Sequence, residues 1–196
     1  MIQFRNAEIR DINKIVKLEV ECMEELKERI GTEFPIFDEK RNNETSLVSI
    51  IEGECGVSII AEENEINGSV KIVGAIIALD KDLKTKEEDD HNTLTIRNMF
   101  VDRNYRKQGI AHKLLELTEN WANEHKYVEI TTFVYTPNIE IQRILNQFGI
   151  QQINEGRKKV IDQKKYAELK NQEILDYYNR VKGNLLSRGD QRNTEL

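Results

Sequence analysis

The first part of the chain places apolar residues at helical spacing. From residue 9 they recur every three or four positions, with charged residues between them: Ile9, Ile12, Ile15, Val16, Val20, Met23, Leu26 and Ile30. This period predicts an amphipathic helix that ends near Gly31, a residue suited to a helix C-terminus. Residues 2–5 predict a short strand before it, and residues 45–52 favour a second short helix.

The middle of the chain has the pattern of β-strands. Residues 57–61 and 70–79 are apolar, and the pair Asn67-Gly68 lies between them. Asn-Gly is a preferred turn between antiparallel strands, so these segments predict a hairpin. After a polar loop, residues 93–101 predict a third strand of the same meander.

Helix and strand then alternate. A long helix opens at Gly109, residues 128–135 predict a strand, and residues 139–147 predict a short helix that stops at Gly149. The long helix carries one apolar stripe, with Leu115 and Thr118 beside it: Ile110, Leu114, Leu117, Trp121 and Ala122. This order predicts an α/β (α+β) fold with a mixed sheet.

The last part of the chain differs in kind. Residues 151–162 show no clear strand pair, whereas residues 163–183 predict an extra C-terminal helix. Its apolar side chains lie near one face: Ala167, Ile174, Tyr178, Val181 and Leu185. Such a face has to bury against its own domain or against a second copy, which would make a homodimer. We predict one domain, residues 1–150, and a C-terminal extension, residues 151–196, with a frayed end.

Composition and charge exclude several classes. Of 196 residues, 33% are charged and 38% hydrophobic, with two prolines and ten glycines, which excludes collagen-like and disordered chains. The net charge is −6, which argues against nucleic-acid binding and weakly favours cationic partners. No apolar run approaches the ~20 residues of a membrane helix, and no signal-peptide segment opens the chain. We therefore expect a cytoplasmic protein with no membrane partner.

The cysteines and histidines do not suggest a metal site. Cys22 and Cys55 have no CxxC spacing, and the three histidines are scattered. A reduced, structural role for both cysteines is the expectation.

The segment from Val101 to Ala111 suggests a binding site for an anion. It joins a strand end, a basic loop and a helix that begins at Gly109. The first N–H groups of a helix have no internal partner and carry partial positive charge, and a glycine lets a phosphate come close. The alternative is a plain strand-to-helix connection with a solvated basic loop.

The same segment resembles the signature of the GNAT acetyltransferase superfamily, Arg/Gln-x-x-Gly-x-Gly/Ala after a strand. The six matching residues run from Arg106 to Ala111, and the residues before them resemble the family's Val-Asp-Pro-x-Tyr, with Arg103 in place of proline. The stretch from Asn138 to Gly149 is similar to the family's Asn-x-x-Ala-x-x-x-Tyr-x-x-x-Gly element. The opening Arg-x-Ala-x-x-x-Asp-Ile is also typical, so the resemblance covers roughly residues 2–150.

The resemblance implies the GNAT fold, in which helices flank a mixed, mostly antiparallel central sheet. It also implies acetyl-CoA as co-substrate and no metal. The main chain of three strand residues would bind the pantetheine arm and the thioester: Met99, Phe100 and Val101. The loop and the start of the helix would hold the pyrophosphate: Arg106, Lys107, Gln108, Gly109, Ile110, Ala111 and His112. Asn138 would hydrogen-bond the pantetheine arm, and it could also cap the following helix.

The positions at which the family carries its acid and base hold no ionisable side chain here. Leu145 stands at the usual acid tyrosine, Phe133 at one base position and Thr95 near another. Tyr135 is the catalytic candidate because strand alternation puts it on the face of Phe133, although a packed aromatic residue is the other interpretation. Three further carboxylates could reach the acceptor cleft from loops or strand ends, but we interpret them as solvated charges: Glu33, Glu62 and Asp80.

The resemblance implies direct transfer of an acetyl group to a primary amine of a small molecule or peptide. Two alternatives remain: a GNAT-fold protein that binds acyl-CoA as a sensor without turnover, and an interaction protein that works through the C-terminal helix. The acidic run of residues 87–90 would gather a polycationic acceptor or be a solvated loop. The sequence does not specify the acceptor.

Overall fold

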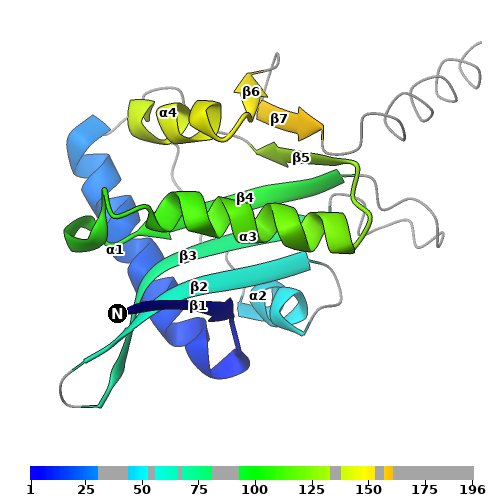
Figure 1. The fold of residues 1–196 in the computed structure, drawn as a ribbon. Helices are drawn as coiled ribbons and strands as arrows, with labels where there is room; N and C mark the ends of the chain where they lie inside the picture. The colour runs from blue at the N-terminus through cyan, green and yellow to red at the C-terminus, as the bar shows by residue number, and fades with distance from the viewer. Residues whose placement is uncertain are drawn as a thin grey trace, which may run out of the picture. The chain divides into compact units, whose positions relative to one another are not determined.

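A seven-stranded mixed sheet organises the part of the chain that the computed structural model describes, namely residues 1–30, 44–52, 56–65, 68–80, 93–132, 138–152 and 157–160 (Figure 1). These residues all belong to one compact unit, Met1–Ile161. The strands are β1 (Ile2–Asn6), β2 (Gly56–Asn64), β3 (Val70–Asp80), β4 (Thr93–Val101), β5 (Glu129–Thr132), β6 (Gln151–Gln152) and β7 (Arg157–Val160).

The sheet is mostly antiparallel. Its order is β1-β2-β3-β4-β5-β7-β6, and within it only the pairing of β4 with β5 is parallel. The hairpin of β2 and β3 is the predicted one, and Gly68 in its turn has a left-handed φ of 81°. The predicted α/β class with a mixed, mostly antiparallel sheet is confirmed.

Helices cover both faces of the sheet (Figure 1). On one face lie α1 (Ile12–Ile30), which a short 3-10 turn precedes, and α2 (Glu44–Ile51); on the other lie α3 (Ile110–Glu124) and α4 (Ile139–Gln147). Each face buries its own apolar cluster, and Figure 1 shows α3 in front of the sheet with α1 behind it. Because the sheet is buried on both sides, its central strands are almost continuously apolar.

Helix α3 packs closely on the sheet at Gly74 of β3. A Cβ atom at this glycine would lie 2.9 Å from Ile110 Cγ2 and 3.4 Å from Leu114 Cδ1. The buried face of α3 is centred slightly away from the apolar stripe that the sequence predicted, since Leu115 and Thr118, expected beside the stripe, are fully buried. Leu117 and Trp121 are only partly buried. The glycine thus lets the first turn of α3 approach the sheet.

Strand β4 contains a bulge. Ile77 of β3 pairs with Asn98, but Ala78 pairs with Ile96, so Arg97 is an extra residue in β4. A bulge of this kind resets the alternation of side chains along a strand. Ile96 before it and Met99 after it both belong to the apolar cluster under α3. The polar pair between them is thereby kept out of that cluster.

Strands β6 and β7 correct one expectation. Gln151 pairs with Lys158, Gln152 pairs with Arg157, and β7 pairs with β5. The expectation that residues 151–162 hold no strand pair is therefore wrong. The side chains of this hairpin are mostly polar, so the sequence shows no alternation of apolar and polar residues there. Main-chain pairing with β5 stabilises the hairpin instead. The sheet continues past residue 150, whereas the predicted helix 163–183 lies outside the described residues.

Candidate functional site

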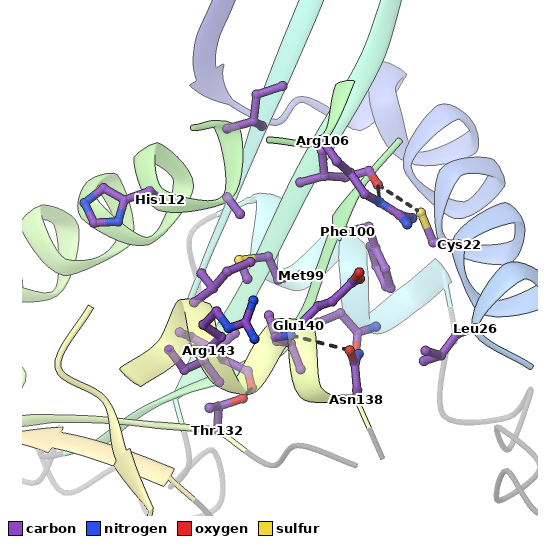
Figure 2. A pocket seen from close by; sticks show the side chains of 18 of the residues that line it. Cys22, Leu26, Met99, Phe100, Arg106, His112, Thr132, Asn138, Glu140 and Arg143 are labelled. Carbon is purple, nitrogen blue, oxygen red and sulfur yellow. Dashed lines mark hydrogen bonds between the residues drawn. The ribbon is translucent and has the colours of Figure 1, made fainter. Parts of the chain in front are cut away.

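A cavity of about 690 Å³ opens at the end of β4, between α1, the start of α3 and α4 (Figure 2). Three consecutive residues of β4 line it: Met99, Phe100 and Val101. Its size is typical of a site for a small molecule or cofactor. The cavity therefore includes the three strand residues that the sequence had singled out.

Strand β4 runs past the described part of its pairing with β5 and along the cavity. The described parallel ladder of β4 and β5 runs from Thr93 and Glu129 to Ile96 and Thr132. Beyond it, β4 continues to Val101, still paired with β3 on its other edge. The following residues 133–137, which include Phe133 and the catalytic candidate Tyr135, lie outside the described residues.

The loop between β4 and α3 is held in a defined conformation. Asp102 accepts hydrogen bonds from the Asn104 N–H at 2.9 Å and from Lys71 Nζ at 2.7 Å. Burial acts to raise the pKa of the Asp102 carboxyl, but Lys71 and the Asn104 N–H outweigh it and hold the pKa below its usual range. A charged, hydrogen-bonded anchor thus fixes the start of the loop.

Two residues of this loop have left-handed backbones. Lys107 has a φ of 62° and Gly109 has a φ of 81°, directly before α3. A non-glycine residue in this conformation costs about 1 kcal/mol, and such strain collects at binding sites. A Cβ atom at Gly109 would meet nothing within 4 Å, and the glycine lines the cavity. The main chain is therefore open to a ligand at the helix N-terminus.

Arg106 is held by helix α1. Its Nη1 and Nη2 each donate to one Glu25 oxygen, both at 2.7 Å, and its Nε donates to the Val101 carbonyl at 3.0 Å. The bidentate bond from Arg106 holds the pKa of the Glu25 carboxyl below its usual range. That the Arg106 side chain binds the pyrophosphate stays a prediction. The guanidinium would then have to contact the pyrophosphate and Glu25 at the same time.

The lining of the cavity is positive although the chain is acidic. Two carboxylates, Glu25 and Glu140, face a larger set of cationic side chains: Arg29, Arg97, Arg106, Lys107 and Arg143. Arg29 Nη1 lies 2.8 Å from Glu140 Oε2, which joins α1 to α4. The excess of positive charge, in a chain of net charge −6, favours an anionic ligand.

Asn138 and His112 also line the cavity. Asn138 Oδ1 accepts from the Ile141 N–H at 3.4 Å, as a cap of α4, and Figure 2 shows this bond beside the cavity. The capping role is thus present, and the contact with a pantetheine arm stays a prediction. The His112 ring meets the edge of the Phe148 ring, with centroids 5.4 Å apart.

Leu145 also belongs to the cavity lining, although it is only 2% exposed and lies within the apolar cluster under α3. Other predicted positions lie elsewhere. Asp80 is not a solvated charge, because it is 3% exposed and accepts from the Tyr127 hydroxyl at 3.4 Å. Glu62 is bonded to Arg5 at 2.7 Å. Glu33, Cys55 and residues 87–90 lie outside the described residues.

The sequence analysis missed one polar contact at the cavity wall. Asn98 lines the cavity, and its Nδ2 donates to Oε1 of Glu19 on α1 at 2.7 Å. Glu19 is only 5% exposed. The signal was present: Glu19 stands four residues after Ile15 and four before Met23, so helical spacing puts it on the apolar face of α1.

The family model described as "Acetyltransferase (GNAT) family" matches residues 13–150, more than half of the chain. This chain belongs to the GNAT acetyltransferase family. The motif at Arg106–Ala111 and the cavity lie within the matched residues. No curated protein sequence matches the chain.

Solved structures of GNAT proteins share the fold. An acetyltransferase of the GNAT family from Staphylococcus aureus Mu50 has a TM-score of 0.66 at 16% identity, covering 83% of this chain and 100% of its own. The paia N-acetyltransferase from Thermoplasma acidophilum, in complex with coenzyme A, has a TM-score of 0.64 at 14% identity, covering 82% and 99%. The putative acetyltransferase yncA from Salmonella typhimurium, with its cofactor acetyl-CoA, has a TM-score of 0.61 at 13% identity, covering 83% and 95%.

Two absences apply to the described part of the chain. None of its helices has the length and apolar content required to cross a bilayer. Within the same residues, no group of three His, Cys, Asp or Glu side chains could hold a metal ion.

Proposed function

We propose that this chain is an acetyl-CoA-dependent N-acetyltransferase that moves the acetyl group directly to a primary amine. The observation that carries the proposal is the cavity at the end of β4, where the GNAT loop, the strand residues Met99 to Val101 and an excess of cationic side chains meet. A location in the cytoplasm and the absence of a nucleic-acid partner stay predictions.

The residues around the cavity suit the parts of acetyl-CoA. The N–H groups at the start of α3, from Lys107 to His112, would bind the pyrophosphate, because they lack intrahelical partners and lie at the positive end of the helix dipole. The main chain of Met99 to Val101 would bind the pantetheine arm, together with Asn138. The open space at Gly109 leaves room for a phosphate.

The chemistry needs few catalytic groups. The bound co-substrate supplies an acetyl thioester. The amine nitrogen forms a bond to its carbonyl carbon, the carbon–sulfur bond breaks, one proton of the ammonium passes to solvent, and the thiolate takes another. A main-chain N–H of β4 would stabilise the oxyanion, which is worth about 3 kcal/mol for one good donor. Tyr135 stays the proposed catalytic residue.

A second function has one specific observation in its favour. Leu145 stands where the family usually has its acid tyrosine, and it is buried in the core at 2% exposure. A protein that binds acyl-CoA as a sensor, without turnover, would not need an ionisable group there. The interaction role of the C-terminal helix likewise stays a prediction.

Calorimetric titration with acetyl-CoA and with CoA tests the cofactor site first. We expect micromolar binding of both, because both carry the pyrophosphate and the pantetheine arm. Free thiol is then measured with acetyl-CoA and a panel of amines: spermidine, kanamycin, lysine and tyramine. Thiol release above hydrolysis supports the enzyme, binding without release supports the sensor, and no binding by folded protein contradicts both.

A further inference from the structure

We propose that Asn98 binds the amino group of the acceptor, and that Glu19 is the residue that orients Asn98 for this contact. The chemical class of the ligand rests on the proposed acetyltransferase function. The site itself rests on the geometry of α1 and β4, on the face of the sheet that carries α1.

The first observation is the burial of Glu19. Its neighbours on the same face of α1 are apolar and buried, among them Ile15 and Leu18. A carboxylate in such a place costs several kcal/mol of desolvation relative to water, and an apolar residue of similar size would pack there at no such cost. A buried charged group beside a cleft is a marker of function.

The second observation is the direction of the Asn98 amide. A carboxylate only accepts hydrogen bonds, so Glu19 selects the orientation in which Nδ2 of Asn98 donates to it, at 2.7 Å. The carbonyl oxygen Oδ1 is then the remaining acceptor of the amide. In the part of the chain that the structure describes, this oxygen has no hydrogen-bond partner. Asn98 belongs to the lining of the cavity.

The bulge in β4 places this oxygen next to the strand segment proposed for the thioester. Arg97 is the extra residue, and Asn98 follows it directly before Met99. Without the bulge, strict alternation would put Asn98 on the α3 face, because Ile96 faces that cluster. The bulge instead turns Asn98 towards α1 and Glu19.

An amine that attacks a thioester needs an acceptor for its remaining N–H groups. Oδ1 of Asn98 can take one of them, which leaves the nitrogen lone pair to point at the carbonyl carbon. The two carboxylates in the lining are less suited to this task. Arg106 binds Glu25 and Arg29 binds Glu140, and each bond holds the pKa of that carboxyl below its usual range.

Kinetics with the best amine of the panel provide the first test. Asn98→Ala should lower kcat/KM for the amine about 10- to 100-fold, since the nitrogen gains positive charge as it attacks and a lost hydrogen bond to a charged group costs about 1.5–3 kcal/mol. In Glu19→Gln the new amide can donate to Oδ1 of Asn98, so the Asn98 amide can rotate by 180° and present Nδ2 to the cavity instead. We expect it to raise KM for the amine about 10-fold, while the Kd for acetyl-CoA stays within about 2-fold.

A matched control comes from the same helix. Glu24 is exposed on α1, so Glu24→Gln removes the same charge without touching Asn98, and it should change neither constant. Melting temperatures of all variants separate loss of fold from loss of binding. Equal losses of acetyl-CoA and amine binding in Asn98→Ala would assign the residue to the cofactor and overturn the inference.

A second readout does not need turnover. The protein, labelled with 15N, is titrated with n-propylamine hydrochloride, with and without CoA, while the Asn98 side-chain amide signal is followed. That signal is identified by its absence in Asn98→Ala. We expect a saturable shift that Glu19→Gln reduces at least 3-fold. The absence of a shift would overturn the inference even if the enzyme is active.

The two readouts separate this inference from the proposed function. A shift without acetylation of any amine leaves the amine site standing and contradicts the acetyltransferase. Acetylation of an amine with an unchanged KM in both variants supports the acetyltransferase and contradicts the amine site at Asn98. Absence of both acetylation and the amide shift contradicts both proposals.

Discussion

The cavity has one wall at the start of α3 and another at α1, and the two differ in how far apart in the sequence their contacting residues lie. The wall at the start of α3 is made by a continuous loop, residues 102–112. The wall at α1 is made by contacts between distant residues: Asn98 with Glu19, Arg106 with Glu25, and Arg29 with Glu140, which are 79, 81 and 111 positions apart. A motif can reveal the first wall, whereas only folding brings the second together.

The walls also differ in their chemistry. The α3 wall offers main-chain N–H groups and two left-handed residues, Lys107 and Gly109. The α1 wall offers charged and amide side chains that hold one another in place. Substitutions should therefore act differently: backbone changes should decide cofactor binding, and side-chain changes should tune what binds beside it.

The largest effect should come from Gly109→Val. The new side chain enters the open space at the helix start, so we expect CoA affinity to fall by at least about 100-fold, or about 2.7 kcal/mol. Gly68→Val is a matched control, because Gly68 has the same φ of 81° and equally open surroundings but does not line the cavity. Calorimetry should show normal CoA binding in Gly68→Val, and equal losses in both variants would refute the phosphate-loop assignment.

Gly74→Val tests whether the local wall depends on distant packing. Its side chain would collide with Ile110, so we expect about 2 kcal/mol of destabilisation and a CoA affinity about 10-fold lower, although Gly74 does not line the cavity. Ile110→Ala makes room, so the double variant should lose less stability than the sum of the two single variants. If denaturant unfolding shows that the losses of stability of the two single variants add exactly in the double variant, this would argue against a contact between residue 74 and Ile110.

Glu25→Gln should have a smaller, pH-dependent effect. The folded-state pKa of Glu25 is lowered, mainly by its hydrogen bonds from Arg106, so the stabilisation is complete above the unfolded pKa and is lost as the pH falls through the folded one. We expect the variant to be about 1 kcal/mol less stable near pH 7, and this difference should shrink as the pH falls below the unfolded pKa of Glu25. A difference that persists in acid would contradict this account.

The same variant reports on Arg106. If that side chain also serves the pyrophosphate, its release from Glu25 should tighten CoA binding about 3-fold, by a few tenths to about 1 kcal/mol. Unchanged affinity would restrict the cofactor contacts of this loop to its main chain.

The smallest effect should come from Arg29→Ala. Arg29 and Glu140 are largely exposed, with 39% and 63% of their side-chain surfaces accessible, so the pair should contribute below about 1 kcal/mol. We expect little change in melting temperature and a CoA affinity within about 3-fold of the parent. A loss above about 10-fold would mean that this pair is part of the cofactor site rather than a surface link between α1 and α4.

The sequence predicted those elements whose signal is local. Helix α3 and the antiparallel hairpin of β2 and β3 carry clear periods, and α3 begins directly after Gly109, as the sequence predicted. The hairpin of β6 and β7 was missed, because Gln, Lys and Arg side chains gave no strand period. Main-chain bonds to β5 form it instead.

At the site, the sequence by itself determined the loop, the glycine and the three strand residues, because a helix N-terminus after a strand end is built from neighbouring residues. Only the tertiary structure decided that Arg106 turns to Glu25, that Asn138 caps α4, and that Glu19 meets Asn98. The physical reason is that a side chain takes its partner from what packing brings within hydrogen-bond distance. The bulge at Arg97, which turns Asn98 towards α1, exists only once β3 and β4 are paired.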